Sequence, residues 1–203
     1  MTRRRDKFWT NHSGAIAAEF ALVLPLLLIF LFGIIDVGRA MWTWNQAEKA
    51  TQAGARFAVA TDMVSIGLRG YSFATSGGLG QGTAIPEASF GGATCTSIGC
   101  ACNAGATCPP LGALDTVAFG RIVDRMRAMM PEIQAANVIV EYGYSGLGYA
   151  GDPNGPDVAP LVTVRLVNMR FQPVTLLVFG RALDLPGFPA TLSMEDGAGR
   201  LSN

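Results

Sequence analysis

An apolar run near the amino terminus constrains this chain more than any other feature. Residues 15–35 read AIAAEFALVLPLLLIFLFGII, and Glu19 is the only charged residue among them. As a helix, this run would extend about 32 Å, which matches a hydrocarbon core of roughly 30 Å. A core helix of a soluble domain normally keeps a polar stripe, which this run lacks. The run therefore predicts a transmembrane helix over residues 15–35.

The flanking charges predict how that helix is oriented. Four basic residues stand among the first seven positions: Arg3, Arg4, Arg5 and Lys7. Positive residues beside a first span stay in the cytoplasm. No second run of this length follows, because the apolar stretch 174–183 is short and contains Arg181. We expect a single-pass protein with a short cytoplasmic amino terminus and everything after Asp36 on the outer side.

The helical pattern continues beyond the apolar run. Apolar and small residues recur there at three- and four-residue steps: Val37, Ala40, Met41, Trp44, Ala47, Thr51, Gly54, Ala55 and Ala58. This spacing predicts an amphipathic stem helix over residues 36–62. Its stripe of small residues suits close packing, either on the chain's own outer domain or on another helix. Trp42 and Trp44 follow the run, where interfacial aromatic residues are expected.

The start of the run resembles a type IV prepilin processing site. Gly14 ends a basic leader, residues 1–14, and Ala15 begins the apolar run. Glu19 and Phe20 are then the fifth and sixth residues after Gly14. In such proteins a membrane prepilin peptidase cleaves after the glycine on the cytoplasmic side, and the new amine is usually methylated. The resemblance implies cleavage between Gly14 and Ala15.

The resemblance extends over residues 13–58, which look like the TadE-like pseudopilin family of tight-adherence (Flp) pilus systems. The positions that carry it are Gly14, Glu19, Phe20, Ala21, Pro25, Gly33, Asp36, Gly38, Arg39, Ala53, Gly54, Ala55 and Arg56. It implies a minor pseudopilin in the bacterial inner membrane, with its carboxy-terminal domain in the periplasm. The implied partners are the prepilin peptidase, other pilin or pseudopilin subunits, the inner-membrane assembly platform and membrane lipid. A place in the filament, at its tip or in the platform is compatible with this resemblance.

Two residues of the run invite specific roles. A carboxylate in a bilayer costs about 2.5–3.5 kcal/mol at the helix centre and less near the interface. We expect Glu19 to be a subunit-recognition charge that neutralises the Ala15 amine of a neighbouring subunit; a plain interfacial glutamate is the alternative. Pro25 removes one backbone hydrogen bond and is expected to kink or loosen the helix. A simply accommodated membrane proline is the alternative. An unprocessed, membrane-anchored envelope binding protein would share this topology without a role for Gly14 or Glu19.

The segment 63–113 is rich in glycine and contains all four cysteines, so we expect a loop. The cysteines have the spacing C-x4-C-x-C-x5-C: Cys95, Cys100, Cys102 and Cys108. Zinc sites favour C-x2-C pairs, whereas an oxidising compartment favours disulfides. We expect two bridges. Three connectivities exist, and a Cys100–Cys102 bridge looks too tight.

Residues 114–203 predict a small α+β domain with an antiparallel sheet. Asp115 is expected to cap a helix that ends near Pro131. Its apolar face would comprise Phe119, Ile122, Val123, Met126, Met129 and Met130. Alternating patterns predict strands at 137–144 and 161–169, with a third at 190–195. Asp152, Asn154 and Asp157 in the connection suit turns better than calcium ligation.

Composition excludes several function classes. The formal net charge is zero, with 15 basic and 15 acidic residues, so nothing suggests a nucleic-acid partner. The only histidine, His12, lies in the expected leader, and no phosphate-loop motif is present. We expect no enzymatic activity, no cofactor and no metal. An envelope enzyme that uses carboxylates alone would need two acids facing each other in a pocket of the outer domain.

Overall fold

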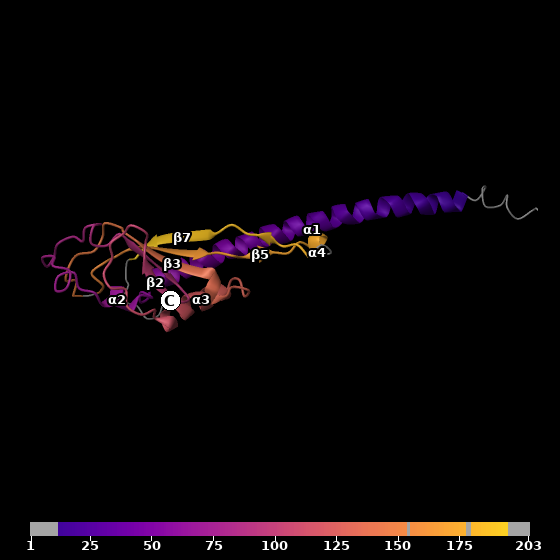
Figure 1. Ribbon diagram of the computed structural model, residues 1–203. Coiled ribbons are helices and arrows are strands. Elements are labelled where there is room, and N and C mark those ends of the chain that lie inside the picture. The colour runs from indigo at the N-terminus through magenta and orange to yellow at the C-terminus, as the bar shows by residue number, and fades with distance from the viewer. Residues whose placement is uncertain (1–11, 154, 178–179, 195–203) are drawn as a thin grey trace, which may run out of the picture. The chain divides into compact units, whose positions relative to one another are not determined.

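The computed structural model describes residues 12–153, 155–177 and 180–194. The chain divides into two compact units. One contains the chain up to Thr43 together with Phe171–Leu183, and the other contains Trp44–Arg170 and the chain from Asp184 onward. One helix, α1 (His12–Val59), passes through both (Figure 1).

The first unit consists of the amino-terminal part of α1 and a short returning segment. Helix α1 is continuous through Pro25. The returning segment contains the one-turn helix α4 (Val174–Leu177). Strand β5 (Arg170–Phe171) precedes α4 in the chain and β6 (Leu183–Asp184) follows it, and these two strands pair with each other.

The second unit contains a five-stranded sheet in the order β2-β1-β3-β4-β7. All four neighbouring pairs are antiparallel. The strands are β1 (Gly92–Thr96), β2 (Gly99–Cys102), β3 (Val138–Gly143), β4 (Leu161–Leu166) and β7 (Phe188–Ser193). The short helices α2 (Ile66–Gly70) and η1 (Ala135–Asn137) and the longer α3 (Thr116–Arg127) complete the unit. The α+β class with an antiparallel sheet is thus confirmed.

The two central strands alternate as their sequences predict. The residues of β3 and β4 that face the core are Val138, Val140, Tyr142, Val162, Val164 and Leu166, all buried. The expected third strand is observed as β7, two residues earlier than predicted. Glu195, at the end of the predicted strand, lies outside the described residues. Tyr144, expected in the first strand, follows its end, and its hydroxyl donates to the Ile85 carbonyl at 3.2 Å.

Two helices supply the apolar side chains that meet this sheet face. The carboxy-terminal part of α1 buries Ala47, Ala50, Thr51, Gly54, Ala55 and Ala58. A Cβ atom on Gly54 would lie 2.8 Å from Met126 Cγ of α3 and 3.3 Å from Val164 Cγ1 of β4. The absence of a side chain at Gly54 therefore allows α1 to approach α3 and the sheet closely.

Helix α3 begins where its cap predicts. Asp115 Oδ1 accepts hydrogen bonds from the backbone N–H groups of Val117 and Ala118, at 3.1 and 2.9 Å. These bonds satisfy donors that have no partner within the helix. The bond from Ala118 is the main cause that lowers the pKa of the Asp115 carboxyl, and the charge of Arg69 adds to it. The helix ends at Arg127, before the predicted end, and Met129 beyond it is exposed.

The segment 63–113 is more ordered than its composition indicated. It contains α2, and its hairpin β1–β2 extends the sheet at one edge. Cys95 lies directly opposite Cys100 in this hairpin and forms a disulfide with it. Cys102 pairs with Cys108. Glycine-rich sequence weakens a strand signal, so the hairpin could not be recognised without its partner β3.

The connection between β3 and β4 is organised by one carboxylate. Asp157 is buried, and its Oδ2 accepts from the N–H groups of Phe73 at 2.6 Å and Gly151 at 2.9 Å. Its Oδ1 accepts from Asp152 N–H at 3.1 Å. These contacts are turn chemistry, as the sequence favoured. Asn154, the third residue of the calcium alternative, lies outside the described residues.

Candidate membrane and assembly site

The residues of the expected processing site lie together at the beginning of α1. Gly14, Ala15, Glu19 and Phe20 are all exposed on this helix. Ala15 and Glu19 are four residues apart and therefore share one face. Glu19 has no polar partner among the described residues. The helix thus presents a single carboxylate, about one turn after Ala15, on an otherwise apolar surface.

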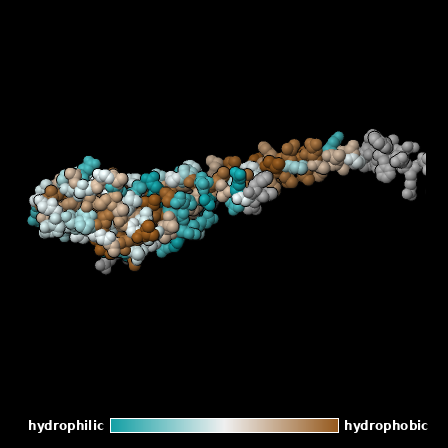
Figure 2. Space-filling model, viewed as in Figure 1, coloured by the Kyte–Doolittle hydropathy of each residue, from teal (hydrophilic) through white to brown (hydrophobic). Residues whose placement is uncertain are grey.

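That surface is apolar on all sides. Large exposed side chains between positions 16 and 37 include Ile16, Leu22, Val23, Leu26, Ile29, Phe30, Ile34 and Val37. Figure 2 shows this part of the helix as a largely hydrophobic surface. Within the described residues, α1 is the one helix long and apolar enough to cross a membrane. Such a helix is compatible with a single-pass anchor.

Helix α1 contains a proline and two glycines in its amino-terminal unit. Pro25 lies inside α1, and the helix continues on both sides of it. Added Cβ atoms on Gly33 and Gly38 would meet nothing within 4 Å. No contact among the described residues therefore requires a glycine at either position.

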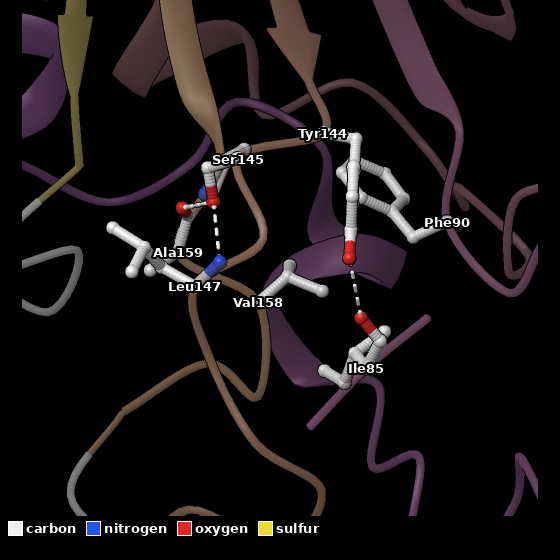
Figure 3. A pocket seen from close by; sticks show the side chains of 8 residues that line it. Ile85, Phe90, Tyr144, Ser145, Leu147, Val158 and Ala159 are labelled. Carbon is white, nitrogen blue, oxygen red and sulfur yellow. Dashed lines mark hydrogen bonds between the residues drawn. The ribbon is translucent and has the colours of Figure 1, made fainter. Parts of the chain in front are cut away.

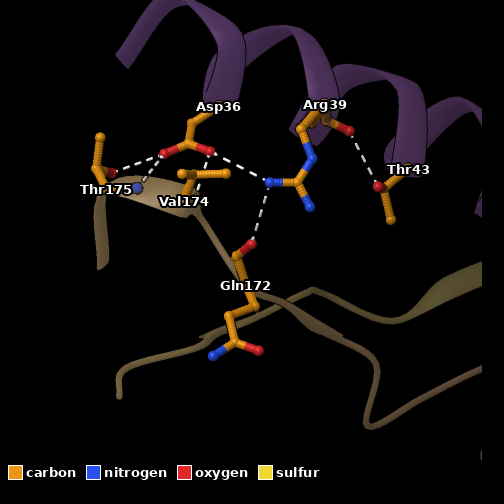
Figure 4. A network of polar contacts seen from close by, with 6 residues as sticks. All are labelled: Asp36, Arg39, Thr43, Gln172, Val174 and Thr175. Atoms are coloured by element: carbon orange, nitrogen blue, oxygen red, sulfur yellow. Dashed lines mark hydrogen bonds and ion pairs between the residues drawn. The ribbon is translucent and has the colours of Figure 1, made fainter. Parts of the chain in front are cut away.

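A polar network closes the apolar run at its carboxy-terminal end (Figure 4). Asp36 Oδ1 accepts from the N–H of Val174 at 2.7 Å. Asp36 Oδ2 accepts from the N–H and the hydroxyl of Thr175, at 2.8 and 2.7 Å. The aspartate is only 7% exposed. It therefore caps the first turn of α4 from a position 138 residues earlier in the chain.

Arg39 completes the network on the next turn of α1. Its Nη1 lies 3.4 Å from Asp36 Oδ1 and 3.5 Å from the Gln172 carbonyl oxygen. Its guanidinium carbon lies 5.5 Å from the centre of the Phe171 ring. Asp36 and Arg39 have no predicted role beyond their place in the resemblance. In the sequence, Asp36 stands at the end of one apolar run and Thr175 at the start of another. No local pattern indicates that these two residues are in contact.

The second unit follows the apolar run in the chain and is called the outer unit from here on. It has a shallow apolar hollow where β3 and β4 are joined (Figure 3). Ser145 and Leu147 lie on one side, Tyr144 and Ile85 on the other, and Val158 between them. Ser145 Oγ donates to the Ala159 carbonyl and accepts from Leu147 N–H, so its hydroxyl is engaged in the turn. No carboxylate is among the described residues that line this hollow.

Two further hollows of the outer unit have no paired acids among the described residues that line them. Glu87 is the acid of the first. The other contains Asp184, which pairs with Arg170 at 3.0 Å. Among the described residues, no group of three or more His, Cys, Asp or Glu side chains is arranged to hold a metal ion. Every cysteine of the sequence is in one of the two disulfides, which fits the prediction of bridges.

Comparison with known proteins finds a similarity over the amino-terminal helix. Residues 14–56 match the family model of TadE-like protein. The matched segment begins at Gly14, includes Glu19 and the Asp36–Arg39 pair, and ends at Arg56. No curated protein and no solved structure matches the chain. Over residues 14–56, the helix that carries the candidate site, the chain is similar to TadE-like protein, as the sequence pattern indicated.

Proposed function

We propose that this chain is a minor pseudopilin that acts in assembly of a tight-adherence (Flp) type IV pilus. The observation that carries the proposal is the lone exposed Glu19, one turn after Ala15, on an all-round apolar helix within the TadE-like segment. In this role α1 anchors the protein in the inner membrane. The unit from Trp44 onward then lies in the periplasm. The chain contributes contacts to the assembly and performs no chemical step.

Processing would create the group that Glu19 needs. Cleavage after Gly14 by a prepilin peptidase leaves a cationic amine on Ala15. Ala15 is exposed on α1, so its amine would be accessible to a neighbouring subunit. An ion pair between one subunit's amine and the next subunit's Glu19 would be shielded from water by apolar side chains. Desolvation offsets much of its strength, so the pair fixes register more than it stabilises.

The first experiment is the amino-terminal mass of the protein recovered from membranes of its native host. We expect the mature chain to begin at Ala15, with or without one added methyl group. A chain that keeps residues 1–14 while the peptidase is present would contradict processing. It would leave an unprocessed anchor with an outer binding domain as the function.

Gly14→Ala separates processing from membrane insertion. We expect the variant to remain in the membrane with its complete leader, because the resemblance to prepilins implies a peptidase that requires glycine itself before the cut. The measurement is again the amino-terminal mass, together with membrane fractionation. Gly33→Ala is the matched control, since both glycines are unconstrained on the same helix. Normal cleavage of Gly14→Ala would overturn the assigned site.

Glu19→Ala separates assembly from processing. We expect cleavage to be largely retained and most surface filaments to be lost, because the amine of the neighbour loses its partner. Filament counts by electron microscopy and the amino-terminal mass report the two effects. Glu48→Ala is the control, since Glu48 is an exposed acid of the same helix whose carboxylate accepts a hydrogen bond from Trp44 Nε1 at 2.7 Å. Unchanged filament numbers for Glu19→Ala would reduce Glu19 to an interfacial glutamate.

A further inference from the structure

The returning segment 171–183 contains an apolar stretch, residues 174–183, which reads VTLLVFGRAL. Phe171 and Pro173 before it are buried, but none of the residues 174–176 and 180–183, whose burial the structure describes, is buried. Val174 is 38% exposed and Leu183 is 52% exposed. An apolar stretch of about ten residues is too short to span a bilayer and is typical of interfacial or re-entrant segments.

The Asp36 network fixes this segment at one level of α1. Asp36 directly follows Ile35, the last residue of the apolar run. Both of its carboxylate oxygens hold the backbone of residues 174 and 175. Arg39 holds the Gln172 carbonyl on the next turn. The segment therefore lies beside the outer end of the run that is proposed to cross the membrane.

The same network satisfies polar groups of the segment that would be costly to place in a low-dielectric surrounding. The first N–H groups of a helix have no partner within it, and such groups are costly in lipid. Asp36 satisfies those of Val174 and Thr175 as well as the Thr175 hydroxyl. The apolar side chains of Val174 and Leu183 are left outward, while Arg181 is exposed. A basic residue next to apolar anchors suits the anionic headgroup region of a bilayer.

We infer that residues 174–176 and 180–183 form a second membrane contact, a lipid-facing interfacial segment that Asp36 holds at the outer end of the transmembrane helix. The occupant of its exposed apolar side is the lipid of the outer leaflet, because Asp36 holds Val174 beside the end of the apolar run, where Ile34 and Val37 are also exposed. This inference rests on the proposed membrane anchoring of α1. It does not depend on cleavage after Gly14 or on pilus assembly.

The test is photocrosslinking of the full chain in vesicles of phosphatidylethanolamine and phosphatidylglycerol. p-Benzoylphenylalanine replaces Val174 or Leu183 in separate variants, and lipid adducts are quantified by mass spectrometry. Ile29 is the control within the proposed span, and Ile98, which is 95% exposed in the outer unit, is the control in water. We expect adducts at 174 and 183 that approach the level at 29 and exceed the level at 98 by about tenfold, since only lipid-contacting positions react with acyl chains.

Each remaining outcome has a distinct meaning. Adducts at 29 but only the level of 98 at positions 174 and 183 would overturn the interfacial contact and leave the anchor intact. Adducts between two protein copies at 174 or 183, in place of lipid adducts, would overturn it in favour of self-association. No adduct at 29 would overturn both the inference and the proposed anchoring.

Asp36→Ala tests the Asp36 network itself. With the photoprobe at Leu183, we expect the lipid adduct to fall at least about threefold, because three hydrogen bonds that hold the segment are lost. Asp124→Ala is the control, since Asp124 is an exposed acid whose partner, Arg127, lies one turn away on the same helix. Retained disulfides and an unchanged adduct at Ile29 would show that Asp36→Ala is folded and inserted. An unchanged adduct at Leu183 in that variant would overturn the role of Asp36.

Discussion

The two ends of helix α1 differ in the apolar side chains that they expose and bury. Before Thr43, the large residues such as Leu22, Ile29 and Phe30 are exposed. After Trp44, the residues that are buried are small, such as Ala47 and Ala50. A helix in water would do the reverse with its large apolar residues. The contrast teaches that one continuous helix has a sequence suited to two surroundings. Its amino-terminal end suits an apolar medium around the whole helix, and its carboxy-terminal end suits a protein core on one face.

The largest expected effect comes from charging the apolar half. The double variant Leu26→Lys/Ile29→Lys should oppose insertion by about 5–7 kcal/mol, at 2.5–3.5 kcal/mol for each lysine. Carbonate extraction of membranes measures the loss of integrated chain. Val117→Lys/Ile98→Lys is the matched control, because Val117 and Ile29 are each 64% exposed. Equal extraction of the two double variants would show that the exposed surface of the apolar run and that of the outer unit are in the same surroundings. The contrast between the two ends of α1 would then not reflect a membrane.

Filling the close approach in the other half should have the next largest effect. Gly54→Val places methyl groups against Met126 and Val164 and should destabilise the outer unit by about 3 kcal/mol through overpacking. Urea unfolding in detergent, followed by Trp44 fluorescence, measures the change. Trp44 suits this purpose because its ring meets Phe188 edge-on at 4.9 Å.

Gly33→Val is the control for that prediction. An added side chain at Gly33 meets nothing within 4 Å, so the free energy of unfolding of the outer unit should be unchanged. Equal unfolding midpoints for Gly54→Val and Gly33→Val would mean that the small-residue stripe does not set the packing distance. That result would remove the reason given for the alanines.

The smallest expected effect concerns the cap of α3 and sharpens what holds the outer unit in water. Asp115→Ala should cost about 1 kcal/mol at neutral pH, whereas Asp115→Asn should cost only a few tenths, because asparagine also caps helices well. The pKa of Asp115 is lower in the folded protein than in the unfolded chain. Its charge therefore stabilises the fold above the unfolded pKa, near 3.9, and this part is lost as the pH falls through the folded pKa.

Urea unfolding of the outer unit at a series of pH values checks this prediction. The difference in unfolding free energy between wild type and Asp115→Asn should shrink as the medium becomes more acidic. A difference that stays constant down to the acid limit would contradict the charge contribution. The cap geometry would then act through its hydrogen bonds alone.

Local periodicity was sufficient for much of this fold. The apolar run of α1, the cap at Asp115 and the alternation in β3 and β4 each predict their element, because each is set by neighbours in sequence. The hairpin β1–β2 could not be predicted, since Gly92 and Gly99 weaken the strand pattern and the hairpin is ordered by its pairing with β3. Gly14 and Glu19 could be predicted as site residues because they stand at fixed distances from the start of the apolar run.

The Asp36 network could not be predicted in the same way. Its partners, Val174 and Thr175, are 138 and 139 residues away. Two of the three donors are backbone N–H groups, which every residue except proline carries, so side-chain identity gives no signal. Only the folded chain shows that the second apolar stretch returns to the end of the first.

The alanine stripe of α1 also has a consequence for entropy. Alanine and glycine have no side-chain rotamers to lose when they are buried, whereas a leucine loses about 0.5–1 kcal/mol. The helix face formed by Ala47, Ala50, Gly54, Ala55 and Ala58 thus joins the core without that loss. The valines of β3 and β4 provide the larger apolar area on the opposite side, and their χ1 angles are already restricted by branching. The contact is assembled from side chains that had little freedom before folding, so its specificity comes from shape at a low cost in side-chain entropy.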